Sequence, residues 1–341
     1  MALRVAVVGA SGYVGSRLVP ELLARGHEVV ALHRRPEPQR FPWSDAVQWR
    51  RADVQDEAQV VAALEGVDAV CHLVHGLDDA DFLQRDRRAA DNVAYATGRV
   101  GARRLVYLSG IVPDLPLEQL SEHLLSRLEV EQVLAGADAS VLTLRASMVI
   151  GAGSTSFEVM RQASHRLPVV QAVPAWMRGS VIQPVSAADA VWALAEALER
   201  PDVTGWLDLV GPEALGYVDL LRTYAAQARL VRVQVPVWLA PVDTVARLAG
   251  ALVDVPSRTV ESLVPSLGHD MVATRDAATV LGEAPTGRLT PAEAIARALA
   301  EEREDGAAVG GDPQRPSAGD PDWSRHRPLL TWLRSLAQRA M

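Results

Sequence analysis

The chain contains a single cysteine, Cys71, among its 341 residues. One cysteine cannot build an internal disulfide framework, and such sparse use of cysteine is typical of a reducing compartment. No uninterrupted apolar run reaches the roughly 20 residues that a membrane-spanning helix needs. The first residues also lack the basic, apolar and small-residue order of a signal peptide. We therefore expect a cytoplasmic protein without a membrane span.

Basic residues are too few to balance the acidic ones, with 34 Lys and Arg against 42 Asp and Glu, which gives a net charge of −8. An acidic surface is unsuited to general nucleic-acid binding, because phosphate backbones attract basic proteins. With 49% hydrophobic and 22% charged residues, the composition is typical of a globular protein. Small molecules or proteins remain as partners, and a homodimer is left open.

Short β-branched runs alternate with longer helical patterns through the first 150 residues. This order is typical of parallel strands joined by crossover helices. Several runs are apolar throughout, as expected for strands covered on both faces. The sequence thus predicts an α/β fold with a doubly wound parallel sheet. The expected strands are Arg4–Val8, Glu28–Leu32, Val47–Arg51, Ala69–Val74, Arg104–Ser109 and Ser140–Leu144, and the expected helices are Val14–Arg25, Glu57–Leu64, Ala80–Val100 and Leu117–Leu134.

A glycine-rich loop joins the first expected strand to the first expected helix. Its first glycine allows a tight turn, its second lets amides approach a pyrophosphate, and its third permits close helix–strand packing. Phosphates favour such a helix start because its free N–H groups and dipole attract negative charge. The pattern predicts a Rossmann dinucleotide site rather than an ordinary strand–turn–helix. The expected contact residues are Gly9, Ser11, Gly12, Tyr13, Val14 and Gly15.

The end of the second expected strand carries Arg34 and Arg35. A site for NAD usually has Asp or Glu there to bind the ribose 2′-hydroxyl. A guanidinium instead suits the 2′-phosphate of NADP, so NADP(H) is favoured, with NAD(H) as the alternative. After the third strand, Asp53 and Val54 stand where a carboxylate could meet the adenine amino group. Helix capping explains Asp53 equally well.

The second half of the chain is less regular. We expect residues 1–150 to form the dinucleotide-binding Rossmann domain, and residues 151–300 to form a smaller, mostly helical region on the substrate or partner side. Within it, Ser186–Asp189 has the spacing of a capping box. Residues 301–324 are rich in Gly, Pro, Asp and Glu, which predicts a disordered linker. Residues 325–341 could form a short terminal helix.

With these motifs together, the chain resembles the short-chain dehydrogenase/reductase superfamily, in particular its atypical NmrA-like members that bind NAD(P)H. The resemblance covers roughly four-fifths of the chain. Beside the glycine loop, it is carried by His72–His75 (HLVH), Tyr107–Gly110 (YLSG), His123–Val130 (HLLSRLEV) and Arg145–Glu158 (RASMVIGAGSTSFE).

The resemblance implies a catalytic Ser, a Tyr and a Lys four residues after the Tyr. Ser109 matches the Ser, but His123 occupies the Tyr position and Arg127 the Lys position. Two interpretations stay open. In one, His123, with a reference pKa of about 6.5, gives or takes a proton while Arg127 binds ribose hydroxyls. In the other, proton transfer is lost and both residues only bind.

The resemblance also suggests contacts outside the glycine loop. Leu73, Val74 and His75 would lie beside the cofactor, at the carboxyl end of the fourth strand, although His75 could equally be a solvated loop residue. Neighbours along a strand point to opposite faces, so Cys71, His72 and His75 do not predict a metal site. The expected substrate-side residues are Met148, Ser154 and Phe157.

Two classes of function fit these features. The first is an NADP(H)-dependent oxidoreductase acting on a small apolar carbonyl, enone or quinone-like substrate. The second is a non-catalytic redox sensor or assembly factor, which binds NAD(P)H and reports its state to a protein partner. The non-standard active site leaves open whether the chain is an enzyme.

Overall fold

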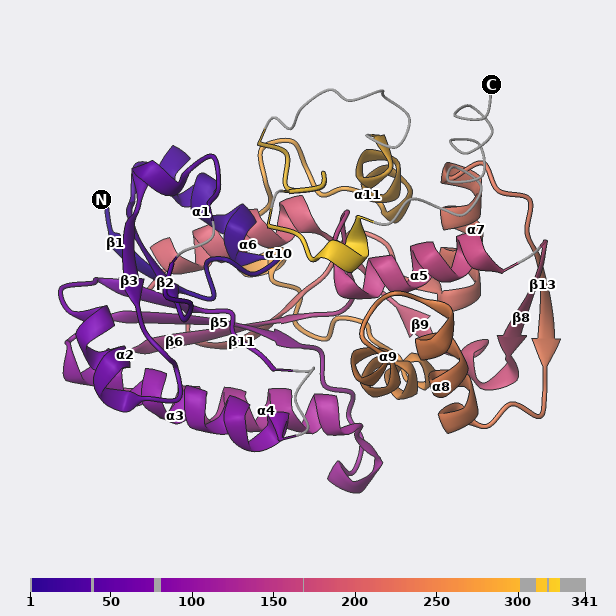
Figure 1. The fold of residues 1–341 in the computed structure, drawn as a ribbon, viewed down its shortest axis with the longest axis horizontal. Helices are drawn as coiled ribbons and strands as arrows, with labels where there is room; N and C mark the ends of the chain where they lie inside the picture. The colour runs from indigo at the N-terminus through magenta and orange to yellow at the C-terminus, as the bar shows by residue number, and fades with distance from the viewer. Residues whose placement is uncertain are drawn as a thin grey trace.

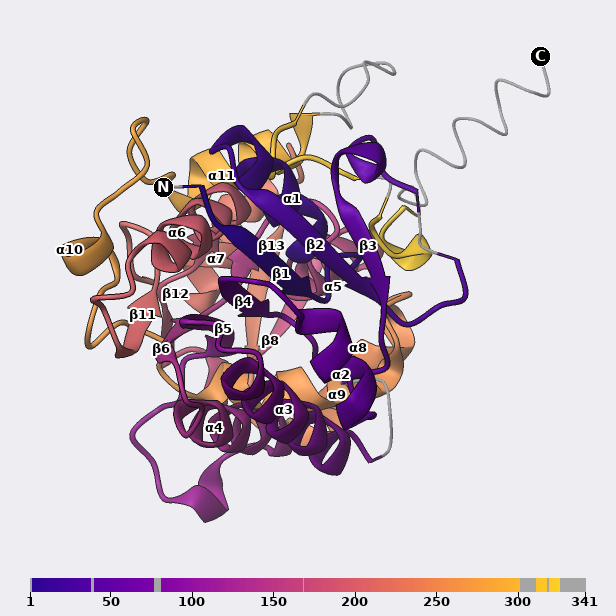
Figure 2. The ribbon, with the colours of Figure 1, turned by 90° about the vertical axis from the view of Figure 1, so that its left-hand side faces the viewer.

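A seven-stranded parallel sheet organises the first half of the molecule (Figure 1). The computed structural model describes residues 2–37, 40–76, 81–167, 169–300, 311–317 and 319–325. The strand order is β11-β6-β5-β4-β1-β2-β3, and Figure 2 shows the strands side by side between two helical layers. The strands are β1 (Arg4–Val8), β2 (Glu28–His33), β3 (Gln48–Arg51), β4 (Ala69–His72), β5 (Arg104–Gly110), β6 (Ser140–Ala146) and β11 (Gly205–Leu209).

Both faces of this sheet are buried, as the continuous apolar strands predict. Val5 and Val7 of β1 point into one core with Leu18, whereas Ala6 and Val8 point into the opposite core. Two helices, α1 and α6, cover the first face, and α2, α3 and α4 cover the second. Their bounds are α1 (Gly15–Ala24), α2 (Glu57–Leu64), α3 (Phe82–Arg99), α4 (Glu122–Ala135) and α6 (Ala187–Glu199).

The second half of the chain contributes to this sheet as well. Strand β11 pairs with β6, and α6 packs on the sheet, so residue 150 is not a clean boundary of the Rossmann domain. Ser186 caps α6 by accepting from the Asp189 amide at 2.9 Å. The carboxylate of Asp189 does not return the bond to the Ser186 amide. It accepts instead from the Leu289 amide, which ties α6 to the chain before α11 (Pro291–Ala298).

A second core lies beyond the carboxyl edge of the sheet. Helices α5, α7 and α11 pack there around Phe157, Tyr224 and Ile295, and α8 and α9 form a small cluster beside them. Three two-stranded pairs, β10–β7, β12–β9 and β13–β8, connect these helices. The bounds are α5 (Thr155–Arg166), α7 (Tyr217–Gln227), α8 (Val242–Leu252), α9 (Ser257–Leu263), α11 (Pro291–Ala298), β7 (Val149–Ile150), β8 (Val170–Pro174), β9 (Val181–Ile182), β10 (Val185–Ser186), β12 (Leu215–Gly216) and β13 (Val233–Val237).

Much of the segment expected to be a disordered linker is packed where the structure describes it. Gln314 and Asp320 are only 0% and 4% exposed. Polar contacts hold most of residues 311–317 and 319–325 against the two cores, and Trp323 packs on the small apolar cluster of α8 and α9. The prediction of disorder is therefore wrong for these residues. Residues 301–310 and nearly all of the expected terminal helix 325–341 lie outside the described residues.

Candidate functional site

The glycine loop makes a tight turn between β1 and α1. Gly9 has φ +99°, a backbone conformation that side chains disfavour. A Cβ at Gly15 would lie 2.2 Å from the Gly9 carbonyl oxygen, so only glycine fits at this point. The three-glycine spacing is thus needed to bring the start of α1 onto the end of β1.

This turn leaves amides free at the start of α1. Gly12 N–H donates to the Gly9 carbonyl and Ser16 N–H to the Gly12 carbonyl. Within the described residues, no acceptor is found for the amides of Tyr13 and Val14, and Gly12 is exposed. Free amides at the positive end of a helix fit a pyrophosphate, so the loop has the donor set that a dinucleotide requires.

The residues expected to select the cofactor follow β2. Arg34 and Arg35 are both exposed, and neither makes an ion pair within the described part of the chain. After β3, the carboxylate of Asp53 accepts from the Gln55 amide at 3.0 Å. The residue that caps α2 is Asp56, which accepts from the Gln59 amide, so the capping alternative for Asp53 is wrong.

Two further sequence expectations concern the next strands. The Val54 carbonyl accepts a hydrogen bond from the Asn92 side chain of α3 at 2.8 Å, which fixes the loop after β3. The chain after β4 packs on the glycine loop, since a Cβ at Gly9 would lie 3.2 Å from Val74 and 3.3 Å from the Leu73 backbone. The chain after β4 therefore borders the glycine loop, and the chain after β3 lies at the neighbouring strand ends, where residues that line a cofactor site are expected.

Ser109, His123 and Arg127 gather at the carboxyl edge of the sheet. Ser109, the last residue but one of β5, is buried, and its hydroxyl has no partner among the described residues. Ser121 caps α4, so His123 enters the first turn and Arg127 follows one turn later. The Arg127 guanidinium donates to the Tyr107 hydroxyl at 3.3 Å and to the Leu108 carbonyl at 3.4 Å.

The histidines of this edge are held neutral. Burial, aided by the charge of Arg127, lowers the pKa of His123 to about 3 and that of His72 to about 4. The pKa of His75 is also lowered, by desolvation and by Arg127, His123 and His72, although the residue as a whole is exposed. An imidazolium at these positions is therefore scarce at neutral pH.

An acid that sequence reasoning missed supports this edge. Asp86 of α3 is 6% exposed and accepts from the Gly76 amide at 2.9 Å and from the Ser126 hydroxyl at 3.3 Å. Desolvation raises the pKa of Asp86, while Arg127 acts in the opposite direction. Asp86 thus ties the loop after β4 to α4. No motif marks it, because its two partners lie 10 and 40 residues away.

The three residues expected on the substrate side lie in the second core. Met148, Ser154 and Phe157 are 9%, 5% and 1% exposed. The Ser154 hydroxyl donates to the Val149 carbonyl and makes no capping bond to α5. Phe157 packs edge-on against Tyr224, with ring centroids 6.0 Å apart. Their contact with a substrate stays a prediction.

The wider composition bears on the chemistry of this site. The chain contains no lysine, so no ammonium group can take the place that Arg127 fills. Among the described residues, no group of three or more His, Cys, Asp or Glu could hold a metal ion. The same residues include no helix long and apolar enough to cross a bilayer.

Comparisons with known proteins agree with this geometry. Residues 9–165 match the NAD(P)H-binding family. An uncharacterised protein of Mycobacterium tuberculosis is 30% identical over 217 residues, which are 63% of this chain but only 22% of that protein. This chain therefore spans about a fifth of that relative's length. The ceramide reductase of Caulobacter vibrioides is 28% identical over 260 residues, 73% of this chain and 77% of the reductase.

Solved structures share the fold. The enzyme WbmG of Bordetella bronchiseptica, in complex with NAD and UDP, is 18% identical and gives a TM-score of 0.64 over 88% of this chain and 94% of its own. The UDP-N-acetylglucosamine 4-epimerase of Bacillus cereus gives 0.63 at 16% identity, over 90% of this chain and 99% of its own. Together with the glycine loop, the family match indicates that residues 9–165 form an NAD(P)H-binding region, and the solved structures show that the chain shares their fold.

Proposed function

We propose that the chain is an NADP(H)-dependent oxidoreductase that acts on a small apolar carbonyl, enone or quinone-like substrate. The observation that carries this proposal is the set of unpartnered polar atoms at the carboxyl edge of the sheet. The Ser109 hydroxyl, one ring nitrogen of His123 and both ring nitrogens of His72 are buried without a partner among the described residues. Buried polar groups are rarely left unpaired in a protein unless a ligand or water pairs with them.

The dinucleotide, when bound, supplies or accepts a hydride at C4 of its nicotinamide ring. Ser109 and neutral His123 donate hydrogen bonds to the substrate oxygen, on which negative charge develops during reduction. Because the pKa of His123 is about 3, its imidazolium is not the proton reservoir at neutral pH. Water then delivers the proton, and Arg127 contributes a permanent positive charge and donors for ribose hydroxyls.

The preference for NADP(H) rests on Arg34 and Arg35. Both are exposed directly after β2, where His33 stands in place of the carboxylate that would hold a 2′-hydroxyl. Their guanidinium groups can grip a 2′-phosphate through charge-assisted hydrogen bonds. The apolar substrate class is supported by the ceramide reductase of Caulobacter vibrioides, whose name gives a lipid as its substrate.

Cofactor selection is tested by titrating NADPH and NADH into Arg34→Ala and Arg35→Ala variants. We expect about a tenfold loss of NADPH affinity in at least one variant, with NADH affinity unchanged, because only NADPH carries the 2′-phosphate. Arg258→Ala is the matched control, since Arg258 is an exposed arginine of α9. Unchanged NADPH affinity in both variants would refute the assignment.

Turnover is tested by following NADPH oxidation with a panel of aldehydes, ketones, enones and quinones. We expect His123→Ala to keep its NADPH affinity but to lose most of its turnover. Because His123 stays neutral, the wild-type rate should show no titration of this residue between pH 5 and 8. The proposed role would be contradicted if the wild-type rate changed with an apparent pKa near 6.5 and the His123→Ala variant lost this pH dependence.

A non-catalytic redox sensor is the second candidate. It is favoured by the absence of the Tyr and Lys that the superfamily uses, and by the pKa of His123, which suits binding better than proton transfer. A sensor would bind NADPH and NADP⁺ with different affinities and pass the difference to a protein partner. Nucleotide binding without turnover on any substrate, in wild type and His123→Ala alike, would select this function.

A further inference from the structure

A segment near the carboxyl terminus crosses the molecule and docks beside the glycine loop. We call residues 311–317 and 319–325 the strap. Gln314 anchors it between the two cores, because its side chain donates to the Ala294 carbonyl and accepts from the Ala188 amide, both at 3.0 Å. Its backbone carbonyl accepts from the Ala152 amide at 3.0 Å. The strap is therefore built into the fold at a fully buried residue.

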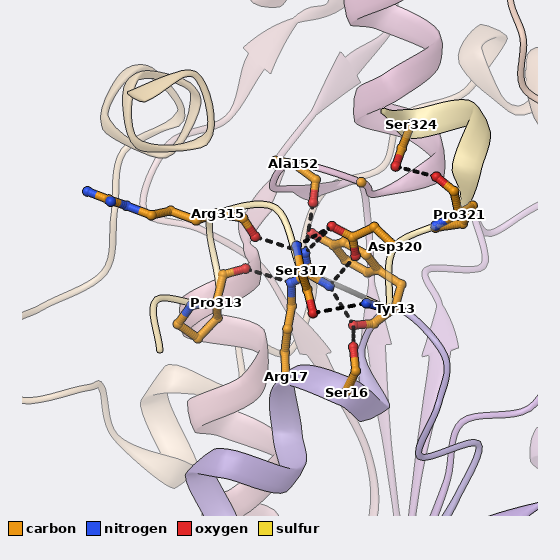
Figure 3. A network of polar contacts seen from close by, with 12 residues as sticks. Tyr13, Ser16, Arg17, Ala152, Pro313, Arg315, Ser317, Asp320, Pro321 and Ser324 are labelled. Atoms are coloured by element: carbon orange, nitrogen blue, oxygen red, sulfur yellow. Dashed lines mark hydrogen bonds and ion pairs between the residues drawn. The ribbon is translucent and has the colours of Figure 1, made fainter. Parts of the chain in front are cut away.

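Arg17 of α1 is the centre of the strap's contacts (Figure 3). Its guanidinium forms a two-pronged ion pair with Asp320, at 2.7 and 2.9 Å, and both side chains are at most 3% exposed. It also donates to the strap carbonyls of Pro313 and Arg315, at 2.8 and 2.9 Å. One side chain of the first helix thus holds three points of the strap.

The same guanidinium reaches the phosphate-binding loop. Its Nη1 atom, which pairs with Asp320, also donates to the Tyr13 carbonyl at 3.0 Å. The Tyr13 ring stacks under the guanidinium, 4.0 Å from its centre, and its hydroxyl is buried. Tyr13 carries one of the loop amides for which no acceptor is found among the described residues. Asp320 therefore acts, through Arg17, on the peptide unit that follows this amide.

A second contact leads to the segment after β2. Gly319 packs so closely on Phe41 that a Cβ there would lie 2.3 Å from the ring. Phe41 stacks on Trp43 with a centroid distance of 4.5 Å, and the Trp43 indole donates to the Ser16 carbonyl at 3.1 Å. The strap thus contacts both the start of α1 and Phe41, which lies between β2 and β3.

We propose that the Asp320 end of the strap is part of the dinucleotide site, and that Asp320 is a positioning residue which fixes the phosphate-binding loop through Arg17. The inference rests on the NAD(P)H binding assigned to that loop, and it names a partner for the loop inside the chain itself. Binding of the dinucleotide and docking of this end of the strap must then favour each other by the same factor, because linkage between two sites is reciprocal.

The geometry distinguishes this role from general stabilisation. Asp312 holds the other end of the strap by pairing with Arg297 of α11 at 2.9 Å and by accepting from the Gln314 amide. No contact joins Asp312 to the glycine loop within the described residues. Asp312→Asn is therefore the matched control for Asp320→Asn, since both remove one carboxylate charge from the same strap.

The test measures the Kd of NADPH and of NADH by fluorescence titration of the full chain at a temperature where all variants are folded. We expect Asp320→Asn to weaken both nucleotides about tenfold, and Asp312→Asn to leave both unchanged. Equal nucleotide affinities in the two variants would show that Asp320 only stabilises the fold, which would refute the proposal. Tighter binding by Asp320→Asn would show that the strap competes with the nucleotide, which also overturns the proposal.

A second measurement needs no variant. In the wild type, the Ser317 amide donates to the Asp320 carboxylate at 2.7 Å and the Asp320 amide to the Ser317 carbonyl at 3.0 Å. Saturating NADPH should slow hydrogen exchange of these amides about tenfold. Unchanged exchange in a chain that binds NADPH refutes the linkage, whereas a chain that binds no pyridine nucleotide refutes the proposed function instead.

Discussion

The stability of the fold should depend strongly on the ion pair between Arg17 and Asp320. Replacing Asp320 by Asn removes the counter-charge of a guanidinium whose side chain is only 3% exposed. Breaking a buried ion pair from one side typically costs about 3–5 kcal/mol, because the remaining charge stays desolvated. Asn can keep a neutral acceptor for Arg17, so we expect a loss of about 3 kcal/mol in the free energy of unfolding.

A surface pair of similar geometry supplies the control. Arg200 also binds Asp202 through two hydrogen bonds, at 3.0 and 2.9 Å, but these side chains are 37% and 65% exposed. Water and salt screen such a pair, so Asp202→Asn should change stability very little. Burial, rather than bond geometry, is the variable that separates the two substitutions.

Equilibrium unfolding in urea, followed by tryptophan fluorescence, measures both effects. The midpoint should fall clearly in Asp320→Asn and stay at the wild-type value in Asp202→Asn, with the same denaturant slope in all three proteins. If Asp320→Asn were as stable as Asp202→Asn, the strap would not be docked on α1 in solution, and the predicted contribution of the buried ion pair to stability would be refuted.

Two other predictions follow from single contacts. Gly15→Ala should abolish dinucleotide binding or prevent folding, because its Cβ would lie 2.2 Å from the Gly9 carbonyl oxygen. Calorimetry measures NADPH binding and circular dichroism measures folding, so the two outcomes can be separated. Normal NADPH binding would contradict the prediction. The pKa of His72 is about 4 in the fold and about 6.5 when unfolded, so acid favours the unfolded state: stability present above pH 6.5 is lost as the pH falls toward 4. Between pH 7 and pH 5 the protonation of His72 alone should lower the free energy of unfolding by up to about 2 kcal/mol. In His72→Phe, the free energy of unfolding measured in urea should fall less steeply over this pH range. An equally steep fall would contradict the lowered pKa of His72.

Local patterns predicted the elements of the sheet well. The bounds of β1 and α2 are those expected from the sequence, and the reciprocal capping box of Thr290 and Glu293 that the structure shows at the start of α11 is equally local. Each of these signals lies within four or five neighbouring residues, so it can be recognised from a short stretch of the sequence. The glycine loop belongs to the same class, since its turn depends on the contact of Gly9 with Gly15.

Other features needed information from distant residues. The pairing of β11 with β6 joins segments about 60 residues apart, across the second core. At the candidate site, the i, i+4 spacing placed His123 and Arg127 together, but the burial that makes His123 neutral follows only from the packing around it.

The strap shows most clearly why composition can mislead. Its few apolar residues suggested that ordering entropy would not be offset, and that reasoning counts only the apolar surface that a segment can bury. Here the order comes from charged and polar groups that meet partners already fixed elsewhere, with Arg17 and Asp320 separated by 303 positions. The only traces in the sequence are small residues that allow close approach: a Cβ at Gly153 would lie 2.5 Å from the Asp320 carboxylate. A polar segment can therefore be ordered wherever the rest of the chain presents a buried opposite charge.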